Sequence, residues 1–152
     1  MANYTLKAES GQINFSPAGF IFSARDCLSC FESYNPVGFS LVKYFLACRT
    51  IELSLKALHL DSVGVAYVKK TFGHDLKLSY EGLKSVRPIL SEQELELLSQ
   101  ASLLYDKSEK AFEYVKPDHA ALAYSMFPDL EALYKLALRF VVYVECYQNA
   151  NP

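Results

Sequence analysis

The stretch Arg49-Thr50-Ile51-Glu52-Leu53-Ser54-Leu55-Lys56 lies inside a long apolar helical pattern and gathers the densest group of ionisable residues in the chain. An α-helix turns by about 100° per residue, so Arg49, Glu52, Lys56 and, one turn later, His59 fall on one side of a helix. Glu52 precedes Lys56 by four positions, the favourable order for a helical ion pair. We therefore predict a polar stripe near the end of this helix, between apolar flanks.

The helix that carries the stripe is predicted to follow Asn35-Pro36 and to extend to about Leu60. Its apolar residues fall on more than one side, with Phe45 and Leu53 on one arc and Cys48, Ile51, Leu55 and Leu58 on another. A helix that is apolar on several sides is buried among neighbours. We expect it to be the central helix of a bundle.

Start and stop signals predict the other helices. Ser16-Pro17 opens a helix that continues to about Ser33, because serine caps a helix and proline fits the first helical position. Ser91-Glu92-Gln93-Glu94 reads as a capping box. Three further helices complete the set: Ser62 to Phe72 with Gly73 as a left-handed stop, a helix opened by His74-Asp75 and broken at Arg87-Pro88, and a helix from Pro128 to about Tyr147.

These elements predict an all-α fold, an up-and-down bundle of four to five main helices. One domain covers residues 1–152, with an irregular lead-in over 1–15 and the bundle over 16–148. We expect a loop with an extended piece over 107–117. The segment that contains His119 has no clear pattern, and we expect this histidine on an exposed loop.

The composition indicates a globular protein, because 51% of the 152 residues are hydrophobic and 21% are charged. The net charge of −2 argues against a protein that holds nucleic acid through bulk charge. Residues 69–87 are mainly basic and residues 91–113 mainly acidic, which fits two segments that pack side by side. No signal peptide is visible, and the apolar run 140–144 is too short to span a bilayer. We expect a cytoplasmic protein without membrane contact.

The four cysteines are Cys27, Cys30, Cys48 and Cys146. Cys27 and Cys30 form a C-x-x-C inside a helical pattern, with no second pair to complete a zinc site and no preceding strand to form a redox site. We interpret them as small apolar fillers of a buried helix. We predict no metal site, no cofactor and no catalytic residue.

One interpretation predicts a polar binding pocket made of Arg49, Glu52, Lys56, His59, His74 and Asp75. Charged groups between apolar walls are typical of sites with shifted pKa values. The alternative is structural: an ion-pair ladder that sets how the helix docks, with Asp75 complementing a helix dipole and His74 capping beside it. Both interpretations stay open on the sequence.

Four stretches carry a resemblance to a known family: Arg49 to Ala57, Gly73-His74-Asp75-Leu76, Tyr105-Asp106-Lys107 and Phe112-Glu113-Tyr114. Over residues 35–147 the chain resembles the HEPN superfamily (higher eukaryotes and prokaryotes nucleotide-binding). The resemblance implies an α-helical up-and-down bundle that is often dimeric. It implies roles around RNA and nucleotides, as ribonuclease toxins, phage-defence effectors or partners of small nucleotidyltransferases. Glu52, Lys56, His74 and Asp75 match the family's polar positions.

The chain departs from the family's ribonuclease pattern, Arg-x4–6-His. None of Arg25, Arg49, Arg87 and Arg139 has a histidine at that spacing. Glu113-Tyr114 stands where related sequences often have Arg-Tyr, and a carboxylate does not clamp a phosphate.

Three hypotheses follow for the function. The first is a non-catalytic HEPN-like binding module of a bacterial cytosol that holds a nucleotide, an RNA segment or a partner protein in a toxin–antitoxin or defence setting. The second is an atypical metal-independent ribonuclease that uses Lys56, His59 and His74. The third is a structural homodimeric subunit of a larger complex. The expected partners are a second copy of the chain and a nucleotidyltransferase or antitoxin.

Overall fold

The computed structural model describes residues 14–83, 86–107 and 127–151. These residues form six α-helices, one π-helical turn and no strand, which confirms the all-α prediction. The elements are α1 (Pro17–Ser33), α2 (Leu41–His59), α3 (Val65–Phe72), α4 (Leu76–Gly82), α5 (Glu92–Ser102), the π-helical turn η1 (Leu103–Lys107) and α6 (Leu130–Ala150).

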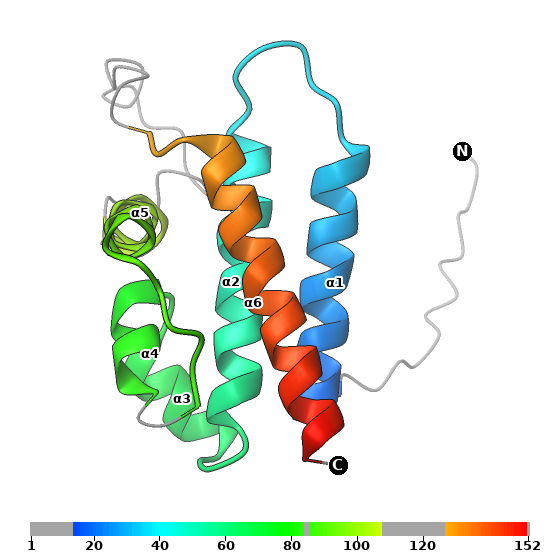
Figure 1. Cartoon of the computed structure of the whole chain (residues 1–152), viewed down its shortest axis with the longest axis vertical. Helices are drawn as coiled ribbons and strands as arrows, with labels where there is room; N and C mark the ends of the chain where they lie inside the picture. Colours follow the sequence, from blue (N-terminus) through cyan, green and yellow to red (C-terminus); the bar gives the residue numbers. More distant parts are fainter. Residues whose placement is uncertain (1–13, 84–85, 108–126, 152) are drawn as a thin grey trace, which may run out of the picture.

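Three long helices, α1, α2 and α6, lie side by side and contact one another (Figure 1). α1 and α2 run in opposite directions, and α6 runs the same way as α2. The short helices α3, α4 and α5 lie on the side of α2 away from α1; α4 contacts α2, and α3 and α5 contact α4. The three long helices thus form the frame, and the short ones cover the remaining side of α2.

α2 is the central helix, as predicted. Every residue from Thr50 to Leu55 is buried, so no side of this segment faces solvent. Its apolar side chains join those of α1, α4, α5 and α6 in one continuous core. Phe140 of α6, the largest fully buried side chain, belongs to the same core.

Side-chain caps define several helix starts. Ser16 caps α1 at the predicted position, and Ser91 with Glu94 forms the predicted capping box of α5. Asp129 caps α6 one residue after Pro128. Asp75 caps α4, and Gly73 before it ends α3 with a φ of 54° and a ψ of −115°, a positive-φ conformation that favours glycine.

Several helix boundaries differ from the prediction, and α6 extends from Leu130 to Ala150 rather than from Pro128 to about Tyr147. α2 starts at Leu41 rather than after Pro36, because Gly38 has a φ of 83° and Ser40 accepts the cap hydrogen bond from the Lys43 amide. α3 starts at Val65, because the Ser62 hydroxyl bonds back to the His59 carbonyl instead of capping forward.

α4 ends at Gly82, well before Pro88, where the break was predicted. Leu83 turns extended and enters the core. The Tyr80 hydroxyl donates to the Pro88 carbonyl at 2.9 Å and holds the following segment against α4.

The remaining predictions concern the loop and terminal segments, the cysteines and a membrane span. The predicted loop from residue 108 onward, His119 and nearly all of the 1–15 lead-in lie outside the described residues. Cys27 is half-buried but Cys30 is exposed, so the prediction that both fill a buried helix is wrong for Cys30, which lies on the outer side of α1. None of the helices that the structure describes is long and apolar enough to cross a bilayer.

Replacing the buried Phe140 with alanine is expected to lower the free energy of unfolding by roughly 3–5 kcal/mol, because the ring leaves a cavity in the core. Val142, two residues away on the same helix, is 49% exposed, and Val142→Ala should change stability by less than about 0.5 kcal/mol. Urea unfolding of both variants measures the difference. Similar losses for the two would contradict the described packing of α6.

Candidate functional site

The carboxylate of Glu52 is the centre of a hydrogen-bonded cluster. Its side chain is only 3% exposed, and four donors surround it. Lys56 Nζ pairs with Oε1, and His74 Nδ1 lies 3.0 Å from the same oxygen. Arg49 Nη1 donates to Oε2 at 2.8 Å, and the Tyr105 hydroxyl donates to Oε2 at 2.6 Å. Both carboxylate oxygens are therefore fully used.

Tyr105 is the member of this cluster that sequence reasoning did not identify as a site residue. It is buried and belongs to η1, where the wider π-helical turn follows α5. The His74 ring stands edge-on to the Tyr105 ring, with centroids 5.9 Å apart. π-helical turns are frequent at functional sites. The available signal was the Tyr105-Asp106-Lys107 segment, which sequence reasoning used only for the family resemblance.

The charge state of Glu52 follows from its partners. Burial alone would raise the pKa of this carboxyl, but the positive charges of Lys56 and Arg49 and their hydrogen bonds hold the pKa below its usual value. Tyr105 behaves in the opposite way: burial and the nearby Glu52 carboxylate raise its pKa, so it stays a neutral donor. Glu52 is thus a fixed negative charge inside the protein.

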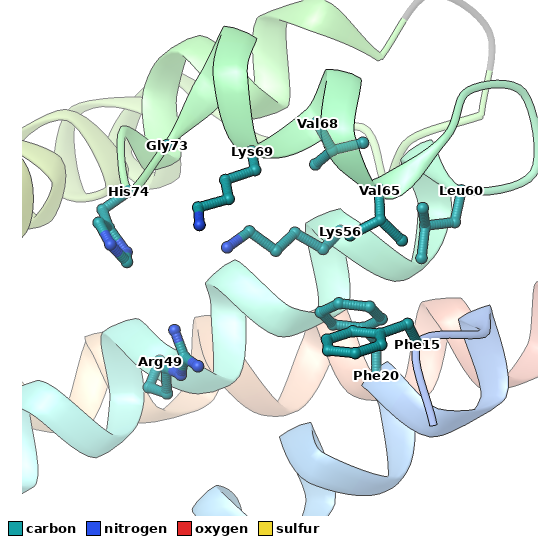
Figure 2. A pocket seen from close by; sticks show the side chains of 10 residues that line it. All are labelled: Phe15, Phe20, Arg49, Lys56, Leu60, Val65, Val68, Lys69, Gly73 and His74. Atoms are coloured by element: carbon teal, nitrogen blue, oxygen red, sulfur yellow. The ribbon is translucent and has the colours of Figure 1, made fainter. Parts of the chain in front are cut away.

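Next to this cluster lies a pocket of about 240 Å³, here called the cationic pocket (Figure 2). The side chains of Lys56 and Lys69 extend toward the end where His74 lies, and Arg49 lies across from them on α2. The rings of Phe15 and Phe20 lie at the other end, near the Lys56 stem. The other lining residues are Leu60, Val65, Val68 and Gly73. The pocket therefore joins a positively charged end to an apolar end.

Four of the six predicted site residues come together here. Arg49, Lys56 and His74 line the cationic pocket. The Glu52 carboxylate, which does not line the pocket, bonds to all three side chains. Lys69 of α3 also lines the pocket. The sequence analysis placed it in the mainly basic segment 69–87 but did not predict it as a site residue. The local helical pairs Arg49–Glu52 and Glu52–Lys56 are as predicted.

The structure does not bring His59 into the cluster. It is buried, its Nε2 lies 2.8 Å from the Ser79 carbonyl of α4, and its ring stacks on Phe72 with centroids 4.2 Å apart. A carbonyl only accepts, so Nε2 carries the proton. Burial lowers the pKa of His59, which favours its neutral form. The ribonuclease set of Lys56, His59 and His74 is therefore not assembled in this structure.

Asp75 also lies outside the cluster. Its Oδ1 accepts from the Leu78 amide as the α4 cap and from the Ser102 hydroxyl of α5, each at 2.9 Å. These bonds fasten α4 to α5. These contacts favour the structural interpretation of Asp75, as a residue at the start of a helix, over the interpretation that places it in the binding pocket.

Within the part of the chain that the structure describes, no three histidine, cysteine or acidic side chains are grouped so as to hold a metal ion. The four cysteines are all free thiols. Cys48 is fully buried, and burial raises the pKa of its thiol.

Comparisons with protein-family models, with curated proteins and with solved structures find no match to this chain.

Replacing Glu52 with glutamine is expected to cost about 2–3 kcal/mol of stability, because Lys56 and Arg49 lose their buried counter-charge. The cost stays below that of a fully buried pair, since the Arg49 side chain is 35% exposed and is screened by water. Glu131→Gln is the matched control, because Glu131 pairs with Lys135 on the surface of α6 and its loss should be nearly neutral. Urea unfolding compares them, and equal effects would disprove the central role of Glu52.

His59 is expected to make folding sensitive to acid. Its pKa is lowered in the folded protein, so below about pH 6.5 the unfolded chain binds a proton that the folded chain resists. Stability is therefore complete above this pH and falls as the pH drops through it. In His59→Gln this part of the loss should vanish, while the contributions of the other histidines remain. Thermal unfolding between about pH 7.5 and pH 5 measures it. Identical pH profiles for the two proteins would refute the role of His59.

Proposed function

We propose that this chain is a HEPN-like, non-catalytic binding module, and that its cationic pocket holds a small ligand with a phosphate and a ring, such as a nucleotide. The observation that carries the proposal is the convergence of Lys56 and Lys69 toward His74 at one end of a pocket whose other end is aromatic (Figure 2).

The charge of the pocket favours an anion. Three permanent cations line it, Arg49, Lys56 and Lys69, and the Glu52 carboxylate behind them compensates one positive charge. Lys69 has no ion-pair partner within the described residues. Its ammonium group is therefore available to a phosphate, for which lysine acts as a point charge.

The apolar end favours a ring. Phe15 and Phe20 lie with centroids 6.3 Å apart, and Phe15 is 57% exposed. Aromatic side chains of this kind accept a stacked base, a contact that tolerates any base. With a volume of about 240 Å³, the pocket fits one small ligand rather than a nucleic-acid strand.

The lack of catalysis is part of the proposal. Two features support it: the chain has no Arg-x4–6-His motif, and His59 is engaged with α4 rather than facing Lys56. The Glu52 carboxylate binds His74 through Nδ1 and fixes the orientation of its ring at the edge of the cationic pocket. We place the module in a homodimer with a nucleotidyltransferase or antitoxin partner, on the strength of the family resemblance alone.

Titration calorimetry with AMP tests the proposal, with adenosine as the uncharged comparison. We expect AMP to bind more tightly than adenosine, and Lys69→Ala to weaken AMP binding by about three- to tenfold. Binding of AMP to Lys69→Ala should also depend less on salt than binding to the wild type, because one screened charge–charge contact is lost. Lys70→Ala is the matched control, because Lys70 is exposed on the same helix but does not line the pocket.

Equal weakening by Lys69→Ala and Lys70→Ala would contradict the proposed pocket, and so would equal binding of AMP and adenosine. Incubation of the protein with mixed RNA in the absence of metal gives a separate readout. Cleavage that Lys56→Ala or His74→Ala abolishes would overturn the non-catalytic assignment in favour of a ribonuclease.

A further inference from the structure

A second pocket, here called the aromatic pocket, lies at the C-terminal end of α2 and has a volume of about 430 Å³. Its walls come from the end of α2, from α3, from the end of α4 and from the end of α6. The residues that matter for its chemistry are His59, Asp61, Tyr67, Phe72 and Tyr147. None of them lines the cationic pocket.

Phe72 contacts two other rings of the aromatic pocket. Phe72 stacks on His59 at 4.2 Å and meets Tyr67 edge-on at 6.3 Å. Gly82 at the end of α4 makes room for the Phe72 ring, since a Cβ at this position would lie only 2.5 Å from the ring. The Phe72 ring is thus fixed in place between α2 and α4, while Tyr67 is 55% exposed at the rim.

The charge of the aromatic pocket is negative. Among the described residues that line it, Asp61 is the one with a formal charge. Burial and the neighbouring Asp61 carboxylate raise the pKa of the Tyr147 hydroxyl, so Asp61 lies close to the aromatic wall. Burial lowers the pKa of His59 and favours its neutral form, so the ring adds no positive charge to the pocket at neutral pH.

We propose that the aromatic pocket binds an alkylated ammonium group, with Tyr67, Phe72 and Tyr147 around the cation and Asp61 as its counter-charge. The faces of aromatic rings attract cations, and alkylated ammonium groups suit such sites because they are weakly hydrated. A phosphate or carboxylate is disfavoured here by Asp61. This site is independent of the anion binding proposed for the cationic pocket, and each can fail without the other.

The test uses choline and 3,3-dimethylbutanol, which has the same shape without the charge. In NMR titrations of the ¹⁵N-labelled chain, choline should shift the amides of α3 and of the adjoining end of α2. The neutral alcohol should bind roughly five- to tenfold more weakly. Equal binding of choline and the neutral alcohol, without tighter binding of the trimethyllysine derivative described below, would overturn the proposal.

Two variants at exposed positions should leave the fold intact. Asp61→Asn and Tyr67→Leu should each weaken choline binding by about threefold or more, whereas Asp26→Asn, an exposed aspartate of α1 that does not line the pocket, should leave it unchanged. Unaltered amide spectra in the absence of choline verify folding. Wild-type affinity in both pocket variants would exclude these residues as the site.

A parallel titration identifies the source of the ammonium group. N-acetyl-trimethyllysine methylamide represents a modified side chain of a protein partner, and choline represents a free small molecule. Tighter binding of the lysine derivative would assign the pocket to a protein partner, and tighter binding of choline to a small molecule. If neither compound binds more tightly than the neutral alcohol, the proposal is wrong.

Discussion

The buried carboxylate of Glu52 is the constraint on which the arrangement around α2 depends. An unpaired carboxylate in the core would be very costly, so each of its two oxygens needs donors. Arg49 and Lys56 supply them from the same helix, whereas His74 comes from the α3–α4 junction and Tyr105 from η1. One side chain thereby links α2 to two other parts of the chain. The same bonds hold the cations at the edge of the cationic pocket.

The short helix α3 lies between two pockets of opposite charge. Lys69 lines the cationic pocket, and Tyr67 lines the aromatic pocket with Asp61 nearby. The end of α2 contributes to both, through Lys56 and Leu60 on one side and His59 on the other. This separation requires α3 to be held firmly. The contact of Phe72 with His59 and the space left by Gly82 supply part of that hold.

Local signals located most helix boundaries correctly, because a cap uses side chains only a few residues away. Ser16, Ser91 and Gly73 act as predicted. One prediction failed where two local signals compete over a short range, and another failed where a tertiary contact ends a helix. Pro36 resembles a helix start, yet Gly38 takes a left-handed conformation and the real cap is Ser40. α4 stops at Gly82 because Leu83 leaves the helix to enter the core, a tertiary effect with no local signature.

By itself the sequence determined the all-α fold, the central place of α2 and the two ion pairs within that helix, because helical spacing alone brings Arg49, Glu52 and Lys56 together. Tertiary structure decided the rest of the site. Tyr105 reaches Glu52 across 53 positions of the chain and His74 across 22. His59 has the same helical spacing as its neighbours but turns to the Ser79 carbonyl, because α4 packs against that side of α2. Periodicity gives the direction of a side chain from its own helix, and only the packing of the helices decides what it meets there.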